Sequence, residues 1–92
     1  MGIENQQDSQ VDAWLREGIA AVKAGQNEQA HDLLVRVVAH DEQNVCGWLW
    51  LSGVVDDLED RKVCLENVLK TDPSNVAARK GLAWVQQQLE QI

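Results

Sequence analysis

The chain has 92 residues, 45% of them hydrophobic and 25% charged, which suits one small globular domain. Its net charge of −7 disfavours nucleic acid and anionic lipid surfaces as partners, because both are themselves negative. No apolar run reaches the roughly 18 residues that a membrane span needs, so we expect no membrane insertion.

The first ten residues, Met1 to Gln10, are polar and lack the basic start and apolar centre of a secretion signal. We therefore predict a flexible tail over residues 1–10 and a cytoplasmic protein. Ser9, followed three places later by Asp12, is typical of a helix start. In the helix that should follow, apolar or small residues recur at intervals of three and four: Val11, Trp14, Leu15, Gly18, Ile19 and Val22.

A second helical segment follows after a short break. Gly25 suits a left-handed helix end, and Asn27 suits the cap of the next helix, which should end near His40. The loop is only a few residues long, so the two helices are expected to be antiparallel neighbours. The apolar stripe of the second helix consists of Ala30, Leu33, Leu34, Val37 and Val38.

The stretch from Val45 to Val55 is apolar on nearly every side and holds two of the four tryptophans. A helix that is apolar all round must be covered on more than one side, so we place this helix in the middle of the fold. Asn44 is its expected cap, and its expected end is near Asp56.

Residues 56–60 form an acidic connection to a fourth helix. Helix capping and solubility explain these carboxylates better than a metal site does, because the calcium-loop pattern is absent. Pro73 should stop the fourth helix. A last helix has a narrow apolar seam, and packing against the fourth helix is favoured over a free coiled coil because two heptads are too few. The seam consists of Ala78, Leu82, Val85, Leu89 and Ile92.

The cysteines and histidines do not have metal-ligand spacing. Cys46 and Cys64 form no CxxC motif, and His31 and His40 stand nine residues apart. We interpret both cysteines as buried reduced thiols and predict no metal and no cofactor.

Two parts of the chain resemble each other at a spacing of 34 residues. The residues Val-Asp-Ala-Trp of 11–14 correspond to Val-Cys-Gly-Trp of 45–48, and each unit ends in Asp-x-x-Asn. Such self-similarity favours a stack over a closed bundle. The pattern resembles the tetratricopeptide repeat, which implies an all-α, right-handed superhelical stack of helix-turn-helix units with five helices. The implied parts are a repeat over 11–44, a repeat over 45–75 and a capping helix over 76–92.

The resemblance also implies roles for individual residues. Large side chains that fill the space between helices, and small residues where the helices cross, should form the core of each repeat. They are Trp14, Gly18, Ala30 and Leu34 in the first repeat, and Trp48, Ser52, Leu65 and Val68 in the second. The second unit departs from the pattern, because it is three residues short in its turn and has Arg61 where a small residue is expected.

No motif of catalysis is present, so we do not expect an enzyme. Stacked helical repeats bind partners on a concave surface. By the resemblance, a largely apolar groove should be lined by Leu15, Arg16, Ile19, Leu49, Trp50, Lys80 and Trp84. The polar residues with which some family members hold a peptide's C-terminal carboxylate are absent. We therefore predict a protein-protein interaction module for an apolar or amphipathic peptide. The alternative is a structural element of a larger assembly that self-associates, for example as a homodimer.

Trp50 and Trp84 are the candidate anchors of this groove. Trp50 points about 200 degrees away from Trp48 on a helix, so one of the two must leave the shared core side. A second arrangement also stays open, in which the last helix covers Trp50 with Trp84 and makes both part of an ordinary core.

Overall fold

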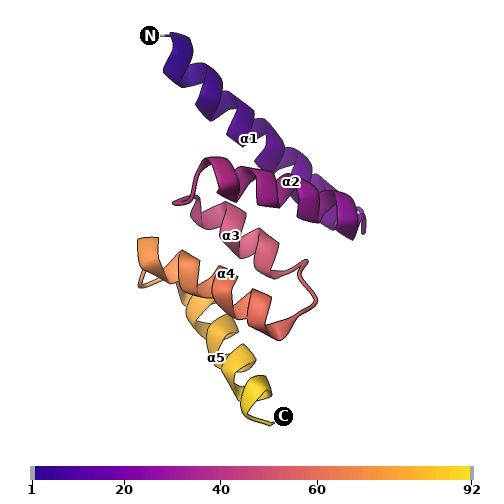
Figure 1. Ribbon diagram of the computed structural model, residues 1–92, viewed down its shortest axis with the longest axis vertical. Coiled ribbons are helices and arrows are strands. Elements are labelled where there is room, and N and C mark those ends of the chain that lie inside the picture. Colours follow the sequence, from indigo (N-terminus) through magenta and orange to yellow (C-terminus); the bar gives the residue numbers. More distant parts are fainter. Residues whose placement is uncertain (1, 92) are drawn as a thin grey trace.

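The computed structural model describes the backbone of residues 2–91 and the side chains of residues 9–91. Within this part the chain forms five α-helices and no strand, which confirms the all-α class. Figure 1 shows the helices following one another in chain order from one end of the molecule to the other. They are α1 (Gly2–Lys23), α2 (Asn27–His40), α3 (Val45–Ser52), α4 (Leu58–Thr71) and α5 (Val76–Glu90).

The main helix contacts join neighbours in the chain. Each helix packs against the next one, and α1 also makes a smaller contact with α3. The resulting array measures 50 × 29 × 18 Å, so it is clearly longer than it is wide (Figure 1). The central position predicted for the helix that begins at Val45 is confirmed, because α3 lies between α2 and α4.

The boundaries of α1 are only partly as expected. The helix already begins at Gly2, so the predicted start near Val11 is wrong, and the backbone of residues 2–10, which were predicted as a flexible tail, is helical. Its end is as predicted: Gly25 has a φ of 77°. The N–H of Gly25 bonds to the carbonyl of Val22 at 3.0 Å, and that of Gln26 to the carbonyl of Ala21 at 2.9 Å. This pair of bonds closes a helix through a left-handed residue, which glycine adopts without steric cost.

Side-chain caps begin three of the helices. The Oδ1 atom of Asn44 accepts a hydrogen bond from the Gly47 N–H at 2.8 Å, as predicted. Asp57 caps α4 and Asn75 caps α5 in the same manner. The cap predicted at Asn27 is wrong, because Asn27 is the first residue of α2 and the capping position belongs to Gln26, whose side chain makes no capping bond.

The helix α3 is shorter than expected and is covered only in part. It ends at Ser52, with Gly53 as its C-cap, instead of near Asp56. Gly47, Leu51 and Ser52 are buried, but most of the other side chains are half-buried and Cys46 is exposed. The expected cover on more than one side is confirmed, because α2, α4 and α1 all contact α3, but these helices leave part of α3 open to solvent.

The core consists of two clusters on either side of α3. The first joins α1, α2, α3 and α4 through Ala21, Ala30, Leu34, Val38, Leu51, Val55 and Cys64. The second joins α4 to α5 through Leu65, Val68, Ala78 and Val85. Trp48 packs against both clusters, so one side chain connects the two halves of the molecule.

Two glycines permit close helix crossings. A Cβ atom at Gly18 would lie 2.9 Å from Cδ2 of Leu34, where α1 crosses α2. A Cβ atom at Gly47 would lie 2.8 Å from Cγ1 of Val37, where α2 meets α3. Because these distances are shorter than a normal carbon contact of about 3.5 Å, a larger residue at either position would push the helices apart.

Candidate interaction surfaces

The predicted groove residues from α1 and α3 share a core cluster only in part. Leu15 and Trp50 are both half-buried, and both pack against the first core cluster. Ile19 is also half-buried, while Arg16 is exposed. Leu49 packs instead against the second cluster, on the side of α4 and α5.

Trp84 is the most open tryptophan of the predicted groove. It lies on α5 with 49% of its surface exposed, and the Arg61 guanidinium lies 5.9 Å from the centre of its ring. Among the described residues one close aromatic pair occurs, between Trp14 and His40, and it includes neither Trp50 nor Trp84. The last helix therefore does not bury these two tryptophans against each other, and Lys80, also on α5, is exposed.

The two tryptophans expected in the core of the repeats are half-buried. The Trp14 ring stands edge-to-face with His40 at 4.9 Å, and the Arg36 guanidinium lies 5.4 Å from its centre. The indole N–H of Trp48 donates to the Glu42 carbonyl at 2.8 Å. Both rings thus keep an edge near solvent. The other expected core residues are buried: Gly18, Ala30, Leu34, Ser52, Leu65 and Val68.

Arg61 occupies the place where the repeat pattern expects a small residue. Its Nη2 atom donates to the Val55 carbonyl at 3.1 Å, and its Nε atom is buried without a hydrogen-bond partner. Because α3 ends at Ser52, the long side chain finds room beside the loop that follows this helix. Arg61 thereby links that loop to the Trp84 ring of α5.

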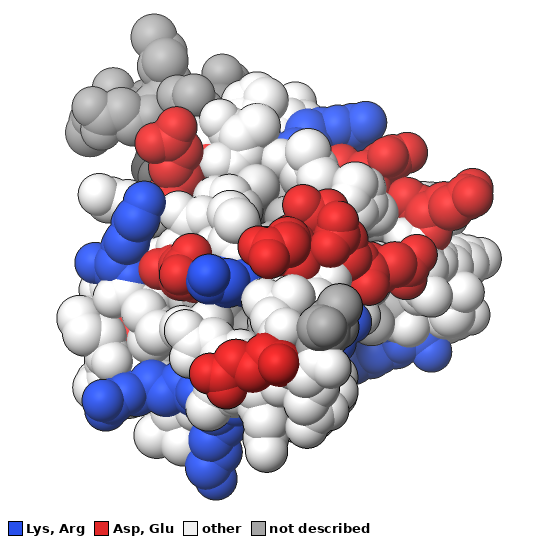
Figure 2. Space-filling model, turned by 60° about the horizontal axis from the view of Figure 1, so that its bottom comes forward, with Lys and Arg blue, Asp and Glu red and all other residues white. Residues whose placement is uncertain are grey.

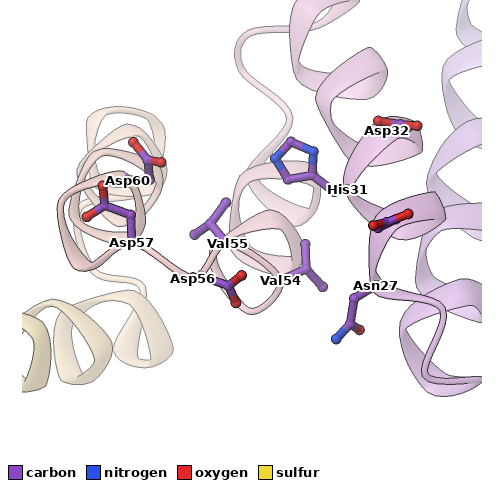
Figure 3. Close-up of a pocket in the computed structure, with 9 residues that line it drawn as sticks. Asn27, His31, Asp32, Val54, Val55, Asp56, Asp57 and Asp60 are labelled. Atoms are coloured by element: carbon purple, nitrogen blue, oxygen red, sulfur yellow. The ribbon is translucent and has the colours of Figure 1, made fainter.

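An acidic hollow of about 520 Å³ lies where α2 and α4 begin. In Figure 3, Asp57 and Asp60 lie on one side, His31 and Asp32 on the other, and Val55 between them. Figure 2 shows Asp and Glu side chains gathered in the middle of this view of the surface, with Lys and Arg mostly toward its edges. The lining residues include no Lys or Arg: Asn27, Glu28, His31, Asp32, Val54, Val55, Asp56, Asp57 and Asp60.

These carboxylates are not arranged as a metal site. Among the residues whose side chains are described, no three His, Cys, Asp or Glu side chains could hold one ion together. Glu28 lies in the first turn of α2, Asp60 lies in that of α4, and Asp57 caps α4. Negative side chains stabilise the positive N-terminal end of a helix, so the helix ends explain why acids gather here.

A second hollow, of about 430 Å³, lies further along the same two helices. Its floor includes Trp48, and its walls come from α2 and α4. Both hollows are open to solvent, and the second is lined by Val35, Val38, Ala39, Glu42, Trp48 and Asn67. Neither hollow was predicted, because both depend on how α2 and α4 are placed on the two sides of α3.

The two cysteines lie in different environments. Cys64 is buried, and this burial, with the negative charge of Asp60, raises the pKa of its thiol to about 11. Cys46 is exposed on α3, so the prediction of two buried thiols is wrong for this residue. The error arises because α3 is covered only in part.

No protein-family model, curated protein or solved structure matches this chain. Within the described residues, every helix is too short or too polar to cross a membrane.

Proposed function

We propose that this chain is a non-catalytic interaction module of the tetratricopeptide kind, which binds an apolar or amphipathic peptide segment in a concave groove. The observation that carries the proposal is Trp84, half-exposed on α5 with the Arg61 guanidinium over its ring. Trp and Arg are enriched among the residues that dominate binding energy at protein interfaces.

The order of the helix contacts supports the repeat assignment. In a stack of helical repeats each unit contacts mainly its neighbours, and here each helix packs mainly on the next one. The crossing of α1 and α2 at Gly18 and Leu34 pairs a small residue with a large one, as the repeat requires. Ala30 is fully buried at the place of the second small residue.

The residues around the larger hollow support a non-catalytic role. The lining of this hollow includes one histidine, His31, but no Ser, Thr, Cys or Lys that this histidine could activate as a nucleophile. The buried thiol of Cys64 has a raised pKa, which disfavours the reactive thiolate.

Selection from a random peptide library on the immobilised chain tests the proposal. We expect the enriched peptides to carry apolar residues at helical spacing. Their affinity should fall at least tenfold on Trp84→Ala or Leu15→Ala, because a buried anchor contributes about 2 kcal/mol or more. The matched control is Val63→Ala, which removes an exposed apolar side chain of α4 outside the groove. Peptides that bind the groove variants as well as they bind the unchanged chain would contradict the proposal.

A further inference from the structure

The exposed large apolar side chains of the described residues lie on two surfaces. Val35 of α2 and Val63 of α4 are 40% and 50% exposed. Val76 and Trp84 of α5 are 62% and 49% exposed. Exposed apolar side chains rimmed by polar residues can mark an interaction site, so both places are candidates for an interface.

The first surface is the α2–α4 furrow, defined here as the residues that line the two hollows together with Val63. The N-terminal parts of α2 and α4 line the acidic hollow, and later parts of both line the other, so the two helices run in the same direction. On α4, Val63 falls between Asp60 of one hollow and Asn67 of the other, at intervals of three and four residues on one helix face. The furrow is therefore acidic at one end and mainly apolar toward the other, where Glu42 and Asn67 add polar groups.

The second surface is the exposed face of α5, here called its outer face, which shares Lys80 and Trp84 with the predicted groove. Val76, Arg79, Lys80, Ala83 and Trp84 are all exposed, and helical geometry places them within about 140 degrees of one another. This face combines apolar side chains with two cations in a chain of net charge −7. This face carries the positive charges that the furrow lacks, because no Lys or Arg lines either hollow.

We propose that the outer face of α5 docks into the α2–α4 furrow of a second copy of this chain. Charge complementarity selects this occupant, because the acidic end of the furrow presents carboxylates and no Lys or Arg, whereas the α5 face presents Arg79 and Lys80. The spacing also agrees. Lys80 and Trp84 are four residues apart, about 6 Å along α5, while Asp32 and Val35 are three residues apart, about 4.5 Å along α2. A parallel arrangement of α5 beside α2 sets Lys80 at the acidic end and Trp84 at the apolar end.

The contact uses a different surface on each partner. Such a heterologous contact leaves one free furrow and one free α5 face in every dimer, so more copies add head to tail. The proposal goes beyond peptide binding and does not rest on it. Variants in the furrow alter no predicted groove residue, so the failure of one proposal is distinguishable from the failure of the other.

The experiment is a measurement of mass against concentration by light scattering. The unchanged chain should exceed the mass of two copies as its concentration rises. Val35→Glu, in the furrow, and Trp84→Ala, on α5, should each remain monomeric with unchanged helical circular dichroism. An equimolar mixture of the two variants should form a dimer and stop there, because it retains one intact furrow and one intact α5 face. Ala20→Glu, at an exposed position of α1 outside both surfaces, is the matched control and should associate as the unchanged chain does.

A charge exchange provides a second test, which does not place a charged side chain in the apolar part of the furrow as Val35→Glu does. Asp32→Lys and Lys80→Glu should each weaken association at least tenfold, and the chain carrying both should recover it. A mass of one copy at every concentration up to the solubility limit would overturn the proposal and leave the furrow to a basic amphipathic segment of another protein. A dimer of the unchanged chain that Val35→Glu does not disturb would overturn it as well, since α5 would then pair with α5.

Discussion

At Gly18 a missing side chain sets the distance between two helices. The fully buried Leu34 side chain lies where a Cβ atom of residue 18 would be, so α1 and α2 approach more closely than two side-chain-bearing positions allow. Elsewhere single residues decide exposure: Trp48 keeps its indole N–H at the Glu42 carbonyl, which holds the ring edge near solvent. The balance between packing and polar contacts therefore leaves Trp14 and Trp48 half-buried, although the sequence pattern alone assigns both to the core.

Gly18→Ala should lower the free energy of unfolding by about 1–3 kcal/mol, the range for overpacking a closely fitted site. The new Cβ would lie 2.9 Å from Leu34 Cδ2, and Leu34 has no room to retreat because it is fully buried. Urea denaturation followed by circular dichroism measures the change. Gly53→Ala is the control, because its φ of −82° suits alanine and its nearest neighbour is 3.4 Å away. Equal stability of both variants would show that the helices do not approach closely at residue 18.

Cys64 should make the stability of the chain depend on pH in alkaline solution. Below about pH 8.5 the thiol is protonated in both the folded and the unfolded chain. Between there and about pH 11 the unfolded chain loses this proton while the folded chain keeps it, because burial raises the folded-state pKa. The free energy of unfolding should therefore fall by about 1.4 kcal/mol per pH unit in this window.

Urea denaturation at several pH values measures this slope, and Cys64→Ala is the control that should lack this contribution to it. Equal slopes for the two chains would contradict the raised pKa. At neutral pH, a thiol reagent should modify the exposed Cys46 quickly and Cys64 only after unfolding.

At the scale of the elements, α3 differs most from expectation. Its eight residues are almost entirely apolar, and the sequence predicted a helix that is covered on more than one side and ends near Asp56. The turn at Gly53 ends the helix early. Arg61 of α4 fills part of the space beside the loop that follows and donates a hydrogen bond to the Val55 carbonyl. A helix this short depends on its ends, because few of its backbone groups are bonded within the helix.

Asn44→Ala should lower the free energy of unfolding by about 1 kcal/mol, as the loss of an N-terminal cap usually does. The substitution removes the acceptor of the Gly47 N–H. Gln26→Ala is the matched control, because Gln26 also stands before a helix but makes no side-chain capping bond, so its replacement should change little. Thermal unfolding of both variants, compared at one protein concentration, distinguishes them. A larger loss for Gln26→Ala would contradict the assignment of the caps.

At the scale of the whole molecule, contacts between helices that follow each other in the chain carry the structure. Two core clusters lie along the array, and Trp48 packs against both of them. In such a linear arrangement, neighbouring units unfold together only if the interface between them is stable enough to couple them. The side chain of Trp48 is therefore expected to matter for cooperativity as well as for stability.

Trp48→Ala should cost about 3 kcal/mol, at the low end for a large aromatic because the ring is half-buried. It should also broaden the urea transition, since the two clusters lose their shared side chain. Trp84→Ala should cost less than about 1 kcal/mol, because that ring is 49% exposed. A sharp transition and a small loss for Trp48→Ala would show that the two clusters are joined by other contacts.

The sequence by itself determined the helices and most of their ends. Periodic apolar residues mark each buried face, and Gly25, Asn44 and Pro73 mark where the chain changes direction, because these effects act within a few residues. It could not determine the early start of α1, the early end of α3 or the half-burial of Trp14 and Trp48. The early end of α3 and the half-burial of both tryptophans depend on what neighbouring helices leave open.

The binding surfaces show the same division. The sequence named Trp50 and Trp84 as anchors, but their exposure differs because Trp50 packs against the first core cluster, whereas Trp84 is 49% exposed on α5. The α2–α4 furrow was not predicted at all, since Asp32 and Asp60 line one hollow only when α2 and α4 pack on the two sides of α3. Local chemistry encodes where a helix begins and ends, whereas a surface between helices exists only once packing has fixed their distance and direction.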